Sequence, residues 1–424
     1  MSVTMLFTMI LGFALSVSIA VSIGFASVAG IALFSSVPML VIPKEIFGAI
    51  DKYPLAAIPF FILAGNLMEV GGISRRLVEF AKSIVGGMQG GLACTCVLTC
   101  MIFASVSGSS VATTFAIGAI LIPAMIKHGY PKPFAASVQA TAAELGVIIP
   151  PSIPMILYGV SAEVSIGELF IAGIGPGIFI GVVLIIFVAV WSRIKGHGKD
   201  DHVGRKPFRV ALREAGLALM MPVIILGGIY GGVFTPTEAS VVAVFYAFLV
   251  GALIYREITV DDLGRILKKS VISSAVIMFI IANAGLFSFL ITRAGVPEQI
   301  GEFLREILKN PAMFLLGVNV ALFLIGMFIE TSAAIIVLAP ILAPVAASFG
   351  IDPVHFGTIM IVNLALGMIT PPFGVNLFAA CTVAKLSLDK MISSLLPFVA
   401  VILACLMVIT YFPPLSLFLR DLAF

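Results

Sequence analysis

Two long apolar segments of this chain repeat one another at a constant offset. Residues 121–158 and 342–379 share five glycines and prolines in register: Pro123, Gly129, Gly146, Pro150 and Pro151 match Pro344, Gly350, Gly367, Pro371 and Pro372. Each copy contains a Gly-x-x-x-Pro-Pro step, which removes two backbone donors and leaves carbonyl groups without partners. In lipid, such a break is tolerated only where it is buried in protein or lines a cavity. Two broken spans at matching places in two halves therefore indicate a transport site.

The composition is that of a membrane protein with many spans. Of 424 residues, 61% are hydrophobic and 11% are charged, with a mean hydropathy of +1.20. Soluble domains are about 45–50% apolar and about 25% charged. The first basic residue is Lys44, so the apolar N-terminus lacks the positive segment that begins a signal peptide. We interpret it as a first membrane helix, in a chain that is embedded in the lipid bilayer.

The charges predict a topology. We expect ten spans, near 3–22, 24–42, 54–70, 133–163, 166–192, 210–230, 236–255, 270–292, 353–384 and 391–412. Two further apolar stretches, about 90–127 and about 312–348, carry polar residues in the middle and are interpreted as re-entrant hairpins. The connections on one side then hold most of the 24 basic residues, which places that side in the cytoplasm and both termini outside. The alternative is that the serines near 105–110 form an ordinary external turn between two full crossings.

With ten crossings, the two hairpins enter from opposite sides, so the halves are predicted to be inverted repeats. The predicted fold is therefore an all-α polytopic membrane protein with one re-entrant hairpin and one broken helix in each half. The duplication extends to 72–80 and 295–303, which are predicted to be amphipathic arm helices with starts at Ser74 and Pro297. We divide the chain into N-terminal scaffold helices, repeat 1, a cytoplasmic loop with connecting scaffold helices, and repeat 2; the ranges are 1–53, 54–192, 193–269 and 270–424.

Several long motifs resemble one transporter family. They are AIPFFILAGNLM (57–68), ASVSGSSVATTFAIGAILIPAM (104–125), LGVIIPPSIPMILYG (145–159), GGVFTPTEASVVAV (231–244), LAPILAPVA (338–346) and GMITPPFGVNLF (367–378). Together they resemble the large membrane subunit, DctM-like, of tripartite ATP-independent periplasmic (TRAP) transporters, from end to end. In GGVFTPTEASVVAV, Thr235 and Glu238 also form a predicted capping box.

The resemblance implies a function and partners. It implies a secondary transporter, not an enzyme, that takes an organic acid from a periplasmic binding protein (P) in the bacterial inner membrane. It also implies a small four-helix membrane subunit (Q), Na+ as coupling ion, and an elevator in which a transport domain moves against a scaffold. Sialic acid is slightly favoured over a C4-dicarboxylate. No nucleic-acid partner is expected.

Sodium prefers oxygen ligands, which hydroxyl groups and the unwound carbonyls of a broken helix supply. We predict one site in each half, where the tip of a hairpin meets the break. The first comprises Ser105, Ser107, Ser110, Gly146, Ile149 and Pro150. The second comprises Gly326, Thr331, Ser332, Gly367 and Thr370. The competing interpretation is that these hydroxyl groups only satisfy helix ends.

The substrate is predicted to bind between the two ion sites. New helix N-termini at the breaks present N–H groups that suit a carboxylate. The candidates are Ser107, Ser152, Asn376 and the intramembrane acids Glu144 and Glu330. Charged groups at membrane depth are usually functional, although Glu144 could also serve only in packing. Asn66 is expected to be a polar packing group between helices.

Other function classes are disfavoured. A stand-alone sodium/anion symporter of the inverted-hairpin type is the alternative, and it would need no binding protein. The chain contains no H-E-x-x-H motif or acidic metal cluster that would indicate a membrane enzyme. A passive channel is disfavoured because two broken helices in inverted halves suit alternating access. The chain has no P-loop of an ATP-driven pump.

Overall fold

The computed structural model describes residues 2–34, 37–199, 205–308 and 310–424, and these residues form helices without β-strands. The all-α prediction is confirmed. Within this part of the chain, eight helices are long and apolar enough to cross a membrane, or up to ten when each bent helix pair is taken as one span. The protein is therefore a multi-pass membrane protein.

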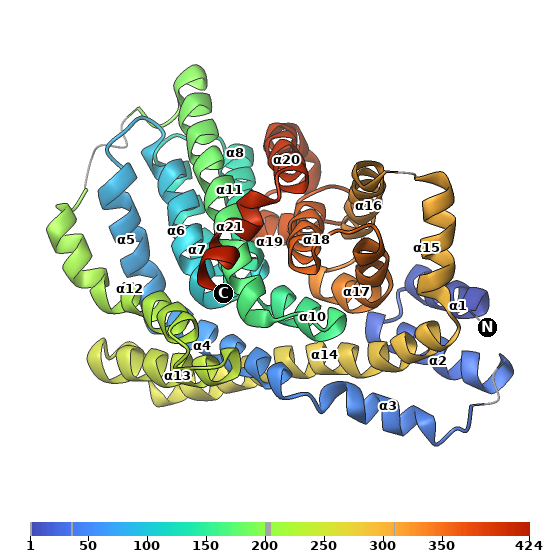
Figure 1. Ribbon diagram of the computed structural model, residues 1–424. Coiled ribbons are helices and arrows are strands. Elements are labelled where there is room, and N and C mark those ends of the chain that lie inside the picture. The colour runs from blue at the N-terminus through green and yellow to red at the C-terminus, as the bar shows by residue number, and fades with distance from the viewer. Residues whose placement is uncertain (1, 35–36, 200–204, 309) are drawn as a thin grey trace.

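One part of the molecule is a layer of helices that lies along the bottom of Figure 1. It contains α2 (Ile19–Phe34), α3 (Val41–Ile50), α4 (Ala57–Val70), α13 (Pro236–Phe248) and the long α14 (Val260–Arg293). α14 packs against α2, α3 and α4, while α13 packs along α4. We call these five helices the scaffold layer.

The other part holds the hairpins and broken helices. The first hairpin is α6 (Gly91–Ser107) and α7 (Ser110–Lys127), and the second is α16 (Pro311–Gly326) and α17 (Thr331–Ser348). The first broken helix is α8 (Lys132–Ala143), α9 (Leu145–Ile148) and α10 (Ile153–Ala162), and the second is α18 (Pro353–Met368) and α19 (Val375–Ala384). We call these nine helices the core bundle. Both proline pairs, Pro150–Pro151 and Pro371–Pro372, contain a cis peptide bond.

In the core bundle, the broken helix of each half packs against the hairpin of the other half. α10, which follows the first break, packs on α17 of the second hairpin. Reciprocally, α19, which follows the second break, packs on α7 of the first hairpin. Tyr158 of α10 adds a direct link, because its hydroxyl donates a hydrogen bond to the carbonyl of Pro353 over 2.8 Å. Neither broken helix can therefore move without displacing the other half.

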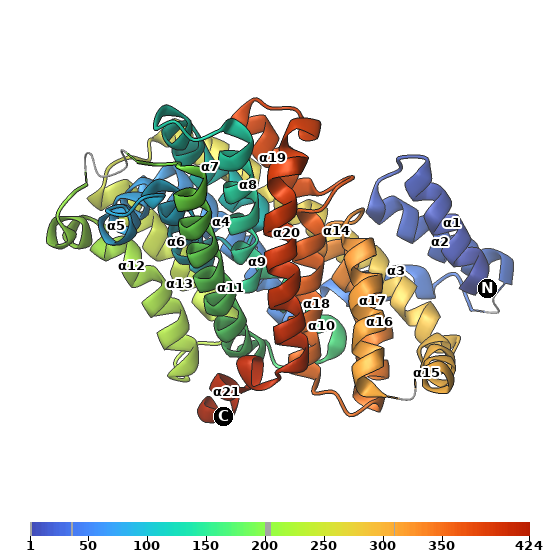
Figure 2. The ribbon, with the colours of Figure 1, turned by 90° about the horizontal axis from the view of Figure 1, so that it is seen from above.

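The remaining helices surround these two parts. They are α1 (Ser2–Ala14), α5 (Ile73–Val85), α11 (Ile166–Lys195), α12 (Phe208–Tyr230), α15 (Val296–Ile307), α20 (Leu388–Tyr411) and α21 (Pro414–Ala423), with the short η1 (Tyr53–Ala56) and η2 (Leu249–Ile254). Figures 1 and 2 agree that α1 and α2 lie at one end of the molecule and α5 and α12 at the other. α5 connects the scaffold layer to the first hairpin, and α15 connects α14 to the second hairpin.

The N-terminal spans differ from the prediction. The segment near 3–22 is not one helix, because α1 ends at Ala14 and α2 begins at Ile19, with Ser16 between them at a φ of 59°. A helix of 13 residues is only about 20 Å long, less than the roughly 30 Å of a bilayer core. Serines in this segment hydrogen-bond to nearby carbonyls, as Ser22 does to Val17, and such bonds compete with helix continuation.

Helix starts show what local sequence determines. The predicted capping box of α13 is confirmed: Thr235 and Glu238 bond reciprocally to each other's backbone N–H groups. The two arm helices begin after Gly72 and Gly295, at φ values of 72° and 65°. The starts predicted at Ser74 and Pro297 are therefore each wrong by one residue, because a left-handed turn that suits glycine precedes each helix.

Candidate functional site

The tip of the first hairpin gathers hydroxyl and carbonyl oxygens. The hydroxyl groups of Ser107 and Thr113 lie 2.9 Å apart, and Thr113 donates to the carbonyl of Ser109 over 2.8 Å. Ser107 also donates to this carbonyl, over 3.3 Å. The turn is possible because Gly108 takes a φ of 60°. Three oxygens from one short loop thus lie within hydrogen-bonding distance of one another.

The first break packs directly against this tip. The N–H of Ile153 donates to the carbonyl of Gly108 over 3.3 Å. A Cβ atom on Gly146 would lie 2.8 Å from both the Ser109 carbonyl oxygen and the Thr113 hydroxyl oxygen. Only glycine lets the helix approach the loop this closely. The structure therefore brings the predicted tip and the predicted break together in the first half.

The donors at this junction suit a hard monovalent cation. They are hydroxyl and carbonyl oxygens with no nitrogen or sulfur among the groups named, which is the chemistry that alkali and alkaline-earth ions prefer. Thr113 was missed by sequence reasoning. Its position one turn after Ser109, on the helix that the tip begins, is the signal that could have identified it.

A polar chain links the two halves behind the tip. Thr114 donates to the side-chain oxygen of Asn376 over 3.3 Å, and the amide nitrogen of Asn376 donates to Glu144. Asn376 and Glu144 are 0% and 2% exposed. The second carboxylate oxygen of Glu144 has no hydrogen-bond partner among the described residues. An intramembrane acid is thus held by one neutral amide from the opposite half.

The second tip is built differently. Glu330 caps α17: its carboxylate accepts from the N–H groups of Ser332 and Ala333 over 2.9 and 3.2 Å. It also accepts from the Ser332 hydroxyl over 2.9 Å. A carboxylate at a helix N-terminus is favourable because it faces the positive end of the dipole. The intramembrane acid Glu330 is therefore engaged with its own helix.

The second break also lies against its hairpin. A Cβ atom on Gly367 would lie 2.4 Å from the Gly326 carbonyl carbon. Thr331 contacts the sulfur of Met368 over 2.9 Å, and Thr370 donates to the carbonyl of Leu366 over 2.8 Å. The predicted members of the second site are adjacent, but the hydroxyl groups of Thr331 and Thr370 are engaged with these neighbours.

A cavity of about 610 Å³ separates the first tip from the scaffold layer. Ser107 and Ser109 line it from the tip, while Asn66 and Lys269 line it from α4 and α14. Asn66 donates to the Ser270 hydroxyl over 2.8 Å, so the predicted packing contact exists, although the residue also faces the cavity. Lys269 pairs with Glu69 over 2.8 Å. Sequence reasoning missed Lys269, because its place at a predicted membrane edge gave no sign that it lines a cavity together with a hairpin tip.

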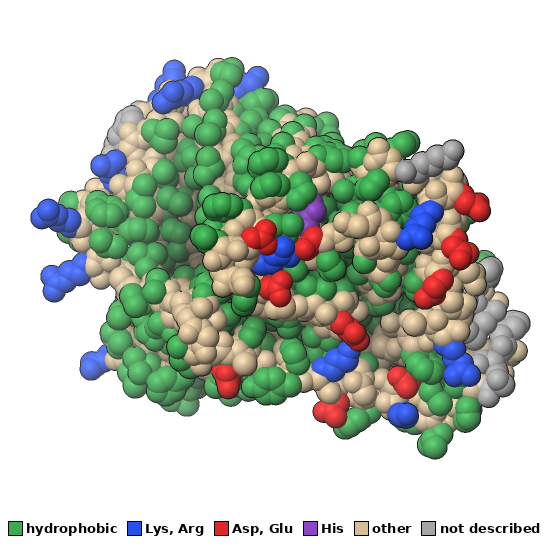
Figure 3. Space-filling model, in the orientation of Figure 1, with side chains coloured by type: hydrophobic (Ala, Val, Ile, Leu, Met, Phe, Trp, Pro, Cys, Tyr) green, Lys and Arg blue, Asp and Glu red, His purple; other side chains and the backbone are tan. Residues whose placement is uncertain are grey.

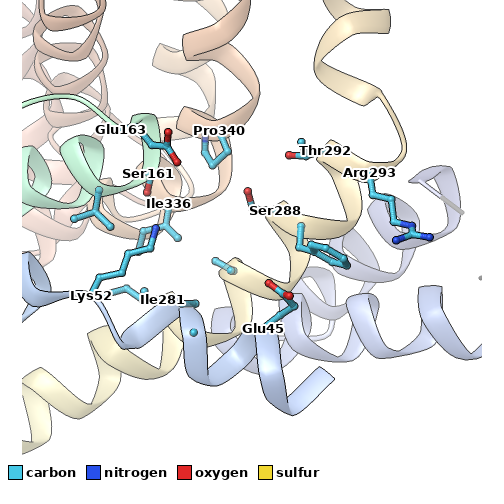
Figure 4. A pocket seen from close by; sticks show the side chains of 16 residues that line it. Glu45, Lys52, Ser161, Glu163, Ile281, Ser288, Thr292, Arg293, Ile336 and Pro340 are labelled. Carbon is cyan, nitrogen blue, oxygen red and sulfur yellow. The ribbon is translucent and has the colours of Figure 1, made fainter. Parts of the chain in front are cut away.

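A second cavity, of about 520 Å³, lies at the other end of α14. It separates α3 and α14 from α10 and α17, and Figure 4 shows Lys52 and Glu163 reaching into it from opposite walls. The two cavities both lie between the scaffold layer and the core bundle. A helix of the scaffold layer, α14, lines both of them.

The other predicted residues are placed as follows. Ser105 donates to the carbonyl of Ile102 over 2.6 Å, and Ser110 begins α7 and is buried. Ile149 has extended backbone between α9 and the proline pair at Pro150. Ser152 donates to the Val147 carbonyl over 2.6 Å and is 1% exposed. The Ser152 hydroxyl therefore stabilises the break in this conformation, and its predicted contact with substrate stays a prediction.

Comparisons with known proteins agree along the whole chain. The family model described as "Tripartite ATP-independent periplasmic transporter, DctM component" matches residues 6–415. A C4-dicarboxylate TRAP transporter large permease protein of Pseudomonas aeruginosa is 42% identical over 400 residues, with 94% of each chain covered. A sialic acid TRAP transporter large permease protein of Vibrio cholerae is 34% identical over 401 residues, covering 95% of this chain and 94% of the relative.

The fold also resembles a solved structure. The YdaH transporter of Alcanivorax borkumensis matches with a TM-score of 0.64, covering 90% of this chain and 87% of the other. At 15% sequence identity, this likeness concerns the fold alone.

Proposed function

The chain belongs to the DctM component family of tripartite ATP-independent periplasmic transporters and is a large permease subunit, and from this premise we propose that it imports an organic acid by sodium-coupled alternating access. The observation that carries the proposal is the junction at Gly146, where the oxygens of Ser107, Ser109 and Thr113 meet the broken helix. A cation bound there would join the hairpin to the break.

We assign the first sodium site to this junction. A sodium ion would replace the hydrogen bonds that Ser107 and Thr113 now make with each other and with the Ser109 carbonyl. The second site is assigned to the tip beginning at Thr331 and the break near Gly367. Because α10 packs on α17 and α19 packs on α7, occupancy of either site would restrain both halves.

The movement we propose is an elevator. The core bundle would slide along the scaffold layer, and the two cavities on α14 mark the boundary between these parts. The cavity beside Lys269 lies on the predicted cytoplasmic side and the cavity beside Lys52 on the predicted periplasmic side. The first tip opens towards the Lys269 cavity, which corresponds to an inward-facing arrangement.

The substrate we propose is a carboxylate. Lys269 is the basic residue at the cavity beside the first tip. An acid released there would compete with Glu69 for its ammonium group and would meet the Asn66 amide. Relatives of this chain are named for C4-dicarboxylates and for sialic acid. The relative named for a C4-dicarboxylate has the higher identity, so this class is the first to test, and sialic acid is the second.

The proposed assembly contains two further proteins. A periplasmic binding protein would deliver the acid, and a small four-helix membrane subunit would accompany this chain in the bacterial inner membrane. Uptake is measured in proteoliposomes that contain both membrane subunits, with the sodium gradient, the binding protein and the candidate acid omitted in turn. We expect each omission to abolish uptake. Uptake without binding protein would favour a stand-alone symporter, and uptake without sodium would refute the coupling.

The first ion site can be tested with one variant at the junction and a matched control variant elsewhere in the first hairpin. Thr113 and Thr95 are both buried and both donate to the carbonyl four residues earlier, over 2.8 and 2.7 Å. Only Thr113 lies at the junction. We expect Thr113→Val to raise the sodium concentration for half-maximal uptake at least about tenfold, a loss of about 1.4 kcal/mol. Thr95→Val should leave it unchanged, and equal effects would refute the assignment.

A further inference from the structure

A basic cavity of about 730 Å³ lies between the arm helix α5 and α12, and none of its lining residues belongs to either proposed ion site. Its charged lining comprises Arg75, Arg76, Lys206 and Arg213 with Glu79 and Glu214. On the face that Figure 3 shows, more basic than acidic side chains are visible on the side where α5 and α12 lie. Acidic side chains gather towards the other side. The cavity is therefore part of a positive end of the molecule.

Ion pairs leave this cavity with unused positive charge. Arg75 and Arg76 share one acid, Glu257, over 3.1 and 2.8 Å. Lys206 pairs with Glu214 over 2.6 Å. Arg213 forms no ion pair within the described part of the chain. The cavity lining and Glu257 together carry four basic and three acidic groups, so one positive charge is in excess, and Arg213 has donors available for another anion.

The start of α12, beside the cavity, carries exposed apolar side chains on more than one face. Phe208, Val210 and Leu212, in the first turns of α12, are 48%, 45% and 40% exposed. α12 itself is long and apolar enough to cross a membrane. Its basic residues therefore stand at the end of a membrane helix, where the headgroups of a bilayer would lie.

A tyrosine strengthens this placement. The Tyr255 ring lies under the Arg76 guanidinium, 3.6 Å from ring centre to Cζ. The Tyr255 hydroxyl donates to the backbone carbonyl of Glu214 over 3.2 Å. Tyrosines favour the membrane–water interface because one end of the side chain is apolar and the other is polar. Here the ring also fixes the orientation of a guanidinium that lines the cavity.

We propose that this cavity binds the phosphate group of an anionic phospholipid, whose acyl chains lie along the exposed apolar side chains of α12, beginning at Val210. Guanidinium groups bind phosphate oxygens through paired N–H donors, and basic pockets between membrane helices on the cytoplasmic side suit such headgroups. Because α5 connects the scaffold layer to the first hairpin, a lipid that bridges α5 and α12 would hold this arm in place.

The test is a binding measurement that needs no transport. The full chain, purified in neutral detergent, is titrated with phosphatidylglycerol, phosphatidylcholine or inorganic phosphate, and bound lipid is counted by native mass spectrometry. We expect phosphatidylglycerol to bind far more tightly than either other probe. Because uptake is not measured, failure here leaves the proposed import intact, and failure of import leaves this site intact.

Two double variants remove equal charge in different places. Lys206→Gln with Arg213→Gln removes one paired and one unpaired basic residue from the cavity. Arg265→Gln with Lys268→Gln does the same on α14, because Arg265 pairs with Asp262 and Lys268 forms no ion pair among the described residues. Each basic residue near an anionic lipid contributes about fivefold in affinity. We expect the cavity variant to bind phosphatidylglycerol about 25-fold more weakly and the α14 variant to bind normally.

If the double variant does not fold, Arg213→Gln alone keeps the test decisive, since Arg213 has no ion pair among the described residues to lose. We expect this single variant to bind phosphatidylglycerol about fivefold more weakly. Equal binding of phosphatidylglycerol and phosphatidylcholine would overturn the proposal. Equally tight binding of inorganic phosphate would reassign the cavity to a free anion. If co-purified small membrane subunit abolishes lipid binding, the surface is a protein interface and the proposal is wrong.

Discussion

Single glycines set the distance between each hairpin and its break. At Gly367, a Cβ atom would lie 2.5 Å or less from two backbone atoms of Gly326. Backbone cannot move aside as a flexible side chain can. We expect Gly367→Ala to lower the free energy of unfolding by about 1–3 kcal/mol, as overpacking does, and to abolish uptake.

Gly264→Ala is the matched control for this substitution, because a Cβ atom at that helical position meets nothing within 4 Å. Alanine there should be neutral or stabilise α14 by up to about 1 kcal/mol. Both variants are compared by thermal unfolding in detergent and by uptake. Equal stability of the two would contradict the close approach at Gly326.

Glu144 offers a second test at the residue scale. Its carboxylate accepts from the Asn376 amide, and glutamine can accept the same hydrogen bond. We expect Glu144→Gln to change the free energy of unfolding by less than about 1 kcal/mol. Glu144→Ala leaves the buried amide unpaired and should cost about 1–3 kcal/mol. Thermal unfolding distinguishes the two, and a glutamine as damaging as the alanine would show that the charge itself is required.

At the scale of elements, the C-terminal helix is fastened to the start of α18. Arg420 of α21 pairs with Asp352 over 2.7 Å, and Asp352 also caps α18 by accepting from the N–H groups of Val354 and His355. Burial raises the pKa of Asp352, but the bonds from Arg420 and from these N–H groups outweigh it, so the pKa lies below its ordinary value.

A lowered pKa stabilises the folded state above the ordinary value of about 3.9. This contribution is lost as the pH falls through the lower folded value. Asp352→Asn should therefore destabilise the protein by roughly 1 kcal/mol at pH 7. The difference from wild type should begin to shrink below about pH 4 and vanish once the pH lies below the lowered folded pKa. Thermal unfolding across this range is the measurement. Asp389→Asn, which removes an acid without an ion pair among the described residues, should show no such convergence.

The elements that sequence predicted well are those that local chemistry determines. Proline pairs break a helix wherever it packs, so the broken helices lie where the Gly and Pro pattern indicated, and the two hairpin turns lie at the polar residues that interrupt the apolar stretches. The same holds for the capping box at Thr235. The N-terminal spans were misplaced because nearly uniform hydrophobicity contains no boundary signal. The link from Thr114 through Asn376 to Glu144 was also missed, because it joins segments more than 200 positions apart and arises only from packing.

The whole molecule consists of two parts in contact across α14, and this contact yields the last prediction. If the core bundle slides along the scaffold layer, a covalent link across the cavity beside the first tip must stop transport. Ala112 of α7 and Ser273 of α14 line that cavity from opposite sides. We expect Ala112→Cys with Ser273→Cys, joined by a short bifunctional thiol reagent, to lose uptake.

The five native cysteines are all buried, so they should react little with the reagent. Each single variant, treated in the same way, should retain uptake, and a cleavable reagent followed by reductant should restore it in the double variant. The link spans the scaffold layer and the core bundle without touching Ser107, Thr113 or Gly146. Full uptake by the linked protein would mean that these two parts do not move past each other, and the acid would then have to cross through a path within the core bundle.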